Sequence, residues 1–441
     1  MKRRQFINQT SMIGAGGLIG LGNLVNAASI RKHISANDKI RFGVIGCNGM
    51  GWSNVRSLLE MEEVELIAIA DVDQNVIDRR ADEYKGMRKN KFKTYKDYRK
   101  VLDDKDVDFV VVGTPDHWHC KIMVDAVQAG KDVYVEKPIA NSIEECNIMM
   151  DAAEKTGRVV QVGQWQRSGS QYMEAKKILD SGQLGKIRLV KVWAYMGHKK
   201  RLPPKPDGPV PEGVDYDFWL GPAPNRPFNP NRFHYFFRYF WDYAGGLMTD
   251  WGVHEIDIAL YLMGATVPKS VMASGGKIAF PDDAAQTPDT LQVIYEYDDF
   301  TMLWEHAMAI DNGPYGKSEG IAFIGNNGTL VVNRKGLEVI IERDMGKRLM
   351  EPMDPVRPEG NALHNHTRNF IEAIKANDPS ALATPITSGG YSSINAQMGN
   401  IAYRTRSKLH WDDQKQVFTG NKEASEMVLA EYHNGWEKPI V

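Results

Sequence analysis

The sequence predicts a two-domain α/β protein in which a parallel sheet covered by helices is followed by an α/β domain with a mostly antiparallel sheet. In the first part of the chain, short apolar runs alternate with helical patterns, which is typical of a parallel sheet. In the second part, strand-like runs follow one another directly, which favours antiparallel pairing. The length of 441 residues is sufficient for two or three domains with sizeable cores.

Composition and charge exclude several classes of protein. Hydrophobic residues make up 42% of the chain and charged residues 25%, as in ordinary globular proteins and unlike disordered, collagen-like or coiled-coil chains. The 54 Lys and Arg against 56 Asp and Glu leave a net charge of −2 without a long basic run, so no nucleic-acid partner is expected. Cys47, Cys120 and Cys146 are too scattered for a disulfide framework or a zinc site, and no metal is expected.

The N-terminus resembles a bacterial twin-arginine export signal. Arg3 and Arg4 precede an apolar, glycine-rich run over residues 12–25, and Ala27 and Ala28 offer small residues for cleavage. The run has 14 residues, whereas a membrane-spanning helix needs about 20. We therefore expect a signal peptide over residues 1–28, a periplasmic protein and no stable membrane insertion, with an uncleaved N-terminal anchor as the alternative.

The first domain is expected over residues 39–162. Its predicted strands are apolar on both faces and cover residues 40–45, 65–70, 109–112, 132–135 and 159–162. In a parallel sheet of this kind, ligands bind at the carboxyl ends of the strands.

A glycine-rich turn follows the first strand and precedes a helix, and its residues are Gly46, Cys47, Asn48, Gly49, Met50 and Gly51. Such a turn lets backbone N–H groups at a helix N-terminus reach a pyrophosphate. Asn48 replaces the usual middle glycine, but asparagine tolerates left-handed backbone and Gly49 lies beside it, so we expect the turn to survive. Asp71 ends the second strand, where a carboxylate binds ribose hydroxyls and repels a 2′-phosphate, which favours NAD over NADP. The alternative is a simple turn and a solvated aspartate.

Two further strand ends carry motifs of polar residues. The strands at 109–112 and 132–135 run into Gly-Thr-Pro-Asp-His-Trp-His and Glu-Lys-Pro, respectively. Together with the glycine turn, Asp71 and a later Asp-x-x-x-His, these motifs resemble the Gfo/Idh/MocA oxidoreductases over almost all of residues 39–412. The resemblance implies a Rossmann domain that holds NAD(P), followed by an α/β domain whose large open sheet contributes substrate contacts and often an oligomer interface. A homo-oligomer formed through that sheet is therefore expected.

The resemblance also implies roles for residues of these motifs. Lys137 would reach the reacting oxygen, and an ammonium there would stabilise developing alkoxide charge. The residues implied to lie beside the cofactor are Thr114, Pro115 and Glu136. His117 and His119 are candidates for cofactor or substrate contact, but a histidine after a strand can also cap the next helix.

The second domain is expected over residues 163–412, with a C-terminal tail at 413–441. Its predicted strands cover residues 186–197, 270–274, 291–297, 300–306, 319–324, 329–332 and 338–342. Helical patterns at 364–376 and 388–406 are expected to close this domain.

A predicted helix between Gly246 and Gly264 carries the Asp-x-x-x-His motif. Asp250 and His254 are four residues apart and share one helical face, and Asp257 follows one turn later. In isolation this would be a solvated pair, but the resemblance implies an acid/base histidine here. We therefore expect His254 to move the hydroxyl proton and Asp250 to orient His254.

A proline- and aromatic-rich segment precedes this helix. Residues 202–230 hold nine of the 21 prolines, and residues 233–243 hold eight aromatic side chains. The segment would form a lid or wall near the active site, or its aromatic side chains would only anchor the long loop. Aromatic rings stack on sugars and arginines donate to sugar hydroxyls, so the expected substrate contacts are Arg167, Arg238 and Trp241.

These features predict an NAD-dependent oxidoreductase that transfers a hydride between a hydroxyl-bearing carbon of a saccharide or polyol and a tightly bound nicotinamide. One alternative is a redox-assisted glycosidase, in which oxidation at C3 acidifies the C2 proton, the glycosidic bond is eliminated and the hydride returns. A second alternative is a non-catalytic sugar or nucleotide sensor.

Overall fold

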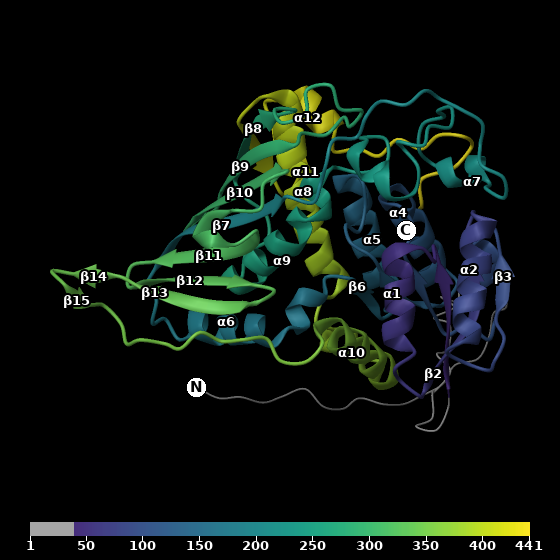
Figure 1. Ribbon diagram of the computed structural model, residues 1–441, viewed down its shortest axis with the longest axis horizontal. Coiled ribbons are helices and arrows are strands. Elements are labelled where there is room, and N and C mark those ends of the chain that lie inside the picture. The colour runs from purple at the N-terminus through teal and green to yellow at the C-terminus, as the bar shows by residue number, and fades with distance from the viewer. Residues whose placement is uncertain (1–38) are drawn as a thin grey trace, which may run out of the picture. The chain divides into compact units, whose positions relative to one another are not determined.

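The computed structural model describes residues 39–441 (Figure 1). The expected signal peptide at residues 1–28 lies outside the described residues. Within residues 39–441, no helix is long and apolar enough to cross a membrane.

The first sheet is six-stranded and entirely parallel, in the order β3-β2-β1-β4-β5-β6. Its strands are β1 (Ile40–Ile45), β2 (Val64–Ala70), β3 (Lys93–Tyr95), β4 (Phe109–Val112), β5 (Asp132–Val135) and β6 (Val160–Val162). The direction of strand order reverses between β1 and β4, and ligands bind at this switch point in open parallel sheets. The short strand β3 was not predicted, because none of its three residues is buried and it lacks an apolar pattern.

The helices of the first domain are α1 (Gly49–Leu58), α2 (Gln74–Lys85), α3 (Arg99–Leu102), α4 (Asp116–Gln128) and α5 (Ile143–Thr156). A sixth helix, α10 (Ala362–Ala376), comes from the C-terminal part of the chain and lies beside α1 (Figure 1). Phe370 of α10 packs edge-on against Phe109 and Tyr134 of the parallel sheet, with ring centroids 5.2 and 5.7 Å apart. The expectation that this helix closes the second domain was therefore wrong, since its apolar face covers the first sheet.

The second sheet has nine strands in the order β13-β12-β11-β7-β10-β9-β8-β16-β17, and only the β7–β10 pair is parallel. Its strands are β7 (Ile187–Met196), β8 (Ser270–Gly276), β9 (Thr290–Glu296), β10 (Thr301–Met308), β11 (Glu319–Gly325), β12 (Gly328–Asn333), β13 (Gly336–Ile341), β16 (Leu409–Asp412) and β17 (Val417–Thr419). The predicted large, mostly antiparallel sheet is confirmed. Strands β14 (Arg343–Asp344) and β15 (Lys347–Arg348) form a separate two-stranded ribbon.

The helical segments of the second part are η1 (Trp165–Ser168), α6 (Ser170–Asp180), α7 (Tyr216–Leu220), η2 (His234–Tyr239), α8 (Leu247–Asp250), α9 (Gly252–Met263), η3 (Pro314–Gly316), η4 (Pro379–Ala381), α11 (Ile386–Thr405) and α12 (Lys422–Glu426). Helix α11 packs against both α9 and α5, so it joins the second sheet's helical layer to the first domain.

The proline- and aromatic-rich segment crosses the carboxyl end of β2. Its backbone binds there, since Asp215 N donates to Val72 O at 2.9 Å and Gln74 N donates to Gly213 O at 3.1 Å. Most of its aromatic side chains form a small apolar core of their own, made of Tyr216, Trp219, Phe228, Phe233, Phe237, Tyr239, Phe240 and Tyr243 with smaller neighbours. The segment therefore anchors itself and also covers one side of the ligand-binding edge.

The stretch at 413–441, expected as a tail, packs on the first domain. After β17 and α12, Glu144 N on α5 donates to Val428 O at 3.0 Å, and Lys438 Nζ pairs with the Glu144 carboxylate at 2.8 Å. The chain end is thus held against α5 by both backbone and charge.

Candidate active site

The glycine turn after β1 is shaped by close backbone contacts. Gly46 has φ +80°, and a Cβ there would lie 2.6 Å from Thr114 N. Helix α1 begins at Gly49, so its first N–H groups have no acceptor within the helix. Asn48 is extended, with φ −92°, and the positive φ falls on Gly49. The turn therefore survives without a left-handed asparagine, contrary to the expected reason.

Asp71 lies at the edge of the same turn. Its carboxylate accepts hydrogen bonds from Cys47 N at 3.0 Å and Asp73 N at 3.1 Å, while burial raises the pKa of this carboxyl. These two bonds hold the carboxylate at the carboxyl end of β2, where the ribose of a bound dinucleotide lies in parallel sheets of this order. Cys47 is buried and acts as a packing residue.

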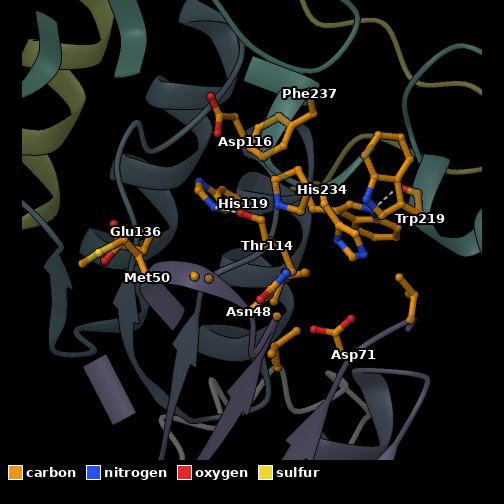
Figure 2. Close-up of a pocket in the computed structure, with 18 of the residues that line it drawn as sticks. Asn48, Met50, Asp71, Thr114, Asp116, His119, Glu136, Trp219, His234 and Phe237 are labelled. Atoms are coloured by element: carbon orange, nitrogen blue, oxygen red, sulfur yellow. Dashed lines mark hydrogen bonds between the residues drawn. The ribbon is translucent and has the colours of Figure 1, made fainter. Parts of the chain in front are cut away.

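A cavity of about 320 Å³ runs along this edge of the sheet. Figure 2 shows Asp71 and Asn48 on one side of it and Asp116 and Phe237 on the other. The expected cofactor residues that line it are Gly46, Asn48, Gly49, Met50, Asp71, Thr114, Pro115, His119, Glu136 and Lys137. Gly51 lies beneath the turn instead, because a Cβ there would collide with the carbonyl oxygen of Gly46.

The cavity suits a dinucleotide. A Cβ at Gly49 would meet nothing within 4 Å, which leaves room for a pyrophosphate at the start of α1. Thr114 Oγ1 is buried and has no hydrogen-bond partner among residues 39–441, so this wall offers a polar group to a ligand. Residues of the proline- and aromatic-rich segment, including Trp219 and His234, line the opposite side.

The two histidines of helix α4 point in different directions. His119 lies on the same face as Asp116, three residues earlier, and both line the cavity. His119 Nδ1 and Nε2 lie 2.7 Å from Pro138 O and 2.8 Å from Thr114 O, so the ring ties two strand ends together. His117 lies outside the cavity, with Nε2 3.0 Å from Trp219 O, so the expectation that it contacts the cofactor was wrong. Burial lowers the pKa of each histidine to about 4.

Lys137 follows the cofactor wall directly and turns towards α8. The peptide bond to Pro138 is cis. Lys137 Nζ donates to Asp250 O at 2.7 Å and to Asp250 Oδ1 at 3.0 Å. Two further cations reach the same carboxylate, Arg238 Nε at 3.4 Å and Lys199 Nζ at 3.9 Å. Despite burial, these three positive charges hold the pKa of Asp250 far below its usual range.

His254 is buried near this cluster but is not bonded to Asp250. Helix α8 ends at Asp250 and α9 begins at Gly252, and no hydrogen bond joins the two side chains in the described structure. Within residues 39–441, His254 Nδ1 has no partner, and burial followed by the charge of Lys137 lowers the pKa of the ring. The expected role of Asp250 in orienting His254 was therefore wrong, because three cations occupy its carboxylate.

Two residues expected at the substrate lie elsewhere. Arg167 forms a two-pronged ion pair with Asp257, with both N–O distances 2.8 Å, and does not line the cavity. Trp241 lines a second cavity beside the C-terminal stretch, and the guanidinium of Arg404 lies 5.2 Å from its ring centre. Of the three expected substrate residues, only Arg238 lies at the cavity that holds Lys137.

Family models match both parts of this arrangement. Residues 40–164 match the oxidoreductase family model for an NAD-binding Rossmann fold, and residues 168–438 match the family's C-terminal alpha/beta domain. The chain belongs to the Gfo/Idh/MocA oxidoreductase family. The cavity at the carboxyl ends of β1, β2 and β4 is accordingly the NAD-binding site of this family's Rossmann domain.

Relatives within the Gfo/Idh/MocA family carry different names. An alpha-N-acetylgalactosaminidase of Shewanella oneidensis is 31% identical over 35% of this chain and 37% of that enzyme, so the match spans about a third of the relative's length. Inositol 2-dehydrogenase 2 of Saccharopolyspora erythraea is 30% identical over 52% of this chain and 55% of its own. The fold of a levoglucosan dehydrogenase solved with NADH and levoglucosan is similar, with a TM-score of 0.62, 18% identity and coverage of 85% and 99% of the two chains.

Several residues of this Gfo/Idh/MocA chain's site were missed by the sequence analysis. Asp116 lines the cavity, and burial raises the pKa of its carboxyl to about 7, although Arg238 and Lys137 oppose that rise. Lys199 joins the Asp250 cluster from a loop after β7. The helical spacing of Asp116 and His119 was a usable clue. Lys199 had none, because its contact depends on how a long loop folds back.

The described residues show no group that would hold a metal ion. Among residues 39–441, no three His, Cys, Asp or Glu side chains come together as metal ligands.

Proposed function

We propose that the protein transfers a hydride between a hydroxyl-bearing carbon of a saccharide or polyol and NAD. The position of Lys137 carries this proposal, because it lines the cofactor cavity and is bonded to Asp250 beside the buried His254. One ammonium thus joins the nucleotide-binding edge to the candidate acid/base. NAD, when bound, supplies the acceptor for the hydride.

The chain's own residues have separable tasks in this reaction. Lys137 donates a hydrogen bond to the substrate oxygen and stabilises negative charge on it. Asp250 is a positioning residue, since two oxygens of this residue hold Lys137 Nζ in place. His254 Nδ1, which is neutral because of burial and nearby positive charge, accepts the hydroxyl proton. Positive charge from Lys137 also makes that hydroxyl a better proton donor.

The proline- and aromatic-rich segment supports tight retention of the cofactor. Its residues Phe218, Trp219, His234 and Tyr235 line the cavity, and His234 Nε2 lies 2.9 Å from Asp73 Oδ2 at the end of β2. A dinucleotide beneath this cover would leave only when the segment moves. We propose that the protein is loaded with NAD in the cytoplasm and exported folded to the periplasm, which the twin-arginine pattern at residues 3–4 supports.

A redox-assisted glycosidase is the second candidate. The Shewanella relative named as a glycosidase supports it, whereas the inositol dehydrogenase supports net oxidation or reduction. Both reactions begin with the same hydride transfer and need the same Lys137 and His254. They differ only in whether the hydride returns to the sugar.

Product analysis distinguishes the two candidates. Purified protein is incubated with a panel of glycosides and polyols, and the products are identified by mass. Loss of two hydrogens from the substrate shows net oxidation, and release of a free sugar without redox change shows glycosidase action. Nicotinamide whose absorbance changes with none of the panel would contradict the proposed function for these substrates.

The nine-stranded sheet supports the proposal of a homo-oligomer. Large apolar side chains are exposed on its outer face, and Ile294 of β9 directly opposes Met272 of β8, at 42% and 43% exposure. Leu189 of β7 is 48% exposed. Contiguous exposed apolar surface of this kind marks an association face. We expect Ile294→Lys to convert the oligomer to a monomer in light scattering, whereas an unchanged mass would exclude this face.

A further inference from the structure

Arg334 occupies a prepared position beside His254. It lies in the turn between β12 and β13, and its guanidinium carbon is 4.7 Å from the ring centre of Trp165 and 4.5 Å from that of Trp251. Both indoles also contact His254, with ring centres 6.2 and 6.3 Å from the imidazole. Two aromatic rings therefore place this cation next to the candidate acid/base.

The hydrogen bonds of Arg334 leave one edge of the guanidinium available. Nε and Nη2 both donate to Gln166 Oε1, at 3.0 and 2.8 Å. In the described chain, Nη1 has no hydrogen-bond acceptor and no carboxylate lies within 4 Å of the group. Burial, together with the charge of Glu319, raises the pKa of nearby Glu255, which reduces the negative charge facing Arg334. The side chain is thus oriented but not neutralised.

The rest of this side of the site is also positively charged. Lys137, Lys199 and Arg238 all surround the single carboxylate of Asp250. Burial keeps His254 neutral, and the pKa of about 7 at Asp116 leaves that carboxyl partly protonated at neutral pH. Excess positive charge in a partly buried site is costly unless an anion accompanies it. The pyrophosphate of NAD belongs at the glycine turn and does not serve this end of the site.

We propose that the substrate saccharide carries an anionic substituent and that Arg334 binds it. A carboxylate or sulfate would accept hydrogen bonds from Nη1 while the sugar ring lies between Trp165 and Lys137. Arginine suits this task because its planar donors match the oxygens of both groups. The inference rests on the proposed function only for the location of the substrate, since binding of the anion needs no turnover.

The test compares matched ligands that differ in one group. Binding of methyl glucuronide and methyl glucoside to the NAD-loaded protein is measured by calorimetry, at low and high salt. We expect the glucuronide to bind at least tenfold more tightly, the usual effect of a hydrogen-bonded charge, and added salt to weaken only that ligand. Glucose 6-sulfate against glucose shows whether a sulfate serves as well as a carboxylate.

Variants assign the effect to Arg334. Arg334→Met should remove the preference for glucuronide while leaving glucoside binding within about twofold. Arg334→Lys should restore part of the preference, which distinguishes charge from packing. The exposed neighbour Lys335 provides the control, and Lys335→Met should behave as wild type.

Three results would overturn the inference: equal binding of the two methyl glycosides, binding of neither, or a preference that survives in Arg334→Met. Failure of the proposed function is recorded separately. It would be shown by glucuronide that binds through Arg334 but never reduces the bound nicotinamide.

Discussion

The cofactor cavity and the substrate side of this site are built in different ways. The cavity is formed by strand ends and backbone, as where Gly46 packs against Thr114 at the switch point of the sheet. The substrate side is formed by charged and aromatic side chains from η1, η2, α8, α9 and the β12–β13 turn. This difference teaches that changes near β1 and β2 should alter nucleotide binding, whereas changes near α9 should alter chemistry with the nucleotide still bound.

The largest effect is expected at His254. If it accepts the hydroxyl proton, His254→Ala should lower kcat by roughly 10²- to 10⁴-fold, the usual contribution of a positioned acid/base. Because α9 lies outside the cofactor cavity, the nucleotide content of the purified variant should match that of wild type. Near-normal turnover would transfer the proton step to another group and break the comparison.

The next effect tests which residue Asp250 serves. Its carboxylate is bonded to Lys137, so Asp250→Asn and Lys137→Met should each lower kcat by about 10²-fold, and the double variant should lose much less than the product of the two. Asp250→Asn combined with His254→Ala should instead be closer to multiplicative. The reverse pattern, with strong coupling only to His254, would restore the orienting role that the sequence suggested.

On the cofactor side, Asp71→Ala should change nucleotide preference and little else. Without this carboxylate, the repulsion of a 2′-phosphate disappears, and we expect the preference for NAD over NADP to fall by about tenfold. Competition between the two nucleotides for protein stripped of its cofactor measures this. Unchanged selectivity would show that Asp71 does not contact the ribose.

Asp116 gives a smaller, pH-dependent effect where the two regions meet. Burial raises the pKa of this carboxyl to about 7, so above that pH it ionises and adds negative charge near Lys137 and Arg238. KM for an anionic saccharide should therefore rise several-fold between about pH 6 and pH 8. Asp116→Asn should flatten that part of the profile, and a profile identical to wild type would mean that another group titrates there.

The smallest effect is expected at Trp241, which lies at the second cavity. Trp241→Ala should leave KM for the saccharide within about twofold, whereas Trp165→Ala, next to His254, should raise it by an amount typical of a lost stacking contact. Thermal unfolding of both variants separates loss of packing from loss of binding. A raised KM in Trp241→Ala alone would reverse this assignment.

The same contrast explains what the sequence could predict. Strands β1, β4 and β5 were predicted with their observed bounds, and the residues that follow them line the cavity, because chain order alone brings strand ends together in a parallel sheet. Helix α10 and Arg167 were misplaced because their partners, Phe109 and Asp257, are distant in sequence. The Lys199 and Arg334 contacts depend in the same way on loops that meet only in the folded chain.

The central claim is that NAD held in this cavity exchanges a hydride with a saccharide beside Lys137 and His254. The most direct test mixes the purified, NAD-loaded protein with the saccharide panel and follows the absorbance of reduced nicotinamide within a single turnover. We predict a rise with at least one saccharide in wild type, and none in His254→Ala carrying the same amount of NAD. Protein that contains no nicotinamide, or an equal rise in the His254→Ala variant, would contradict the account.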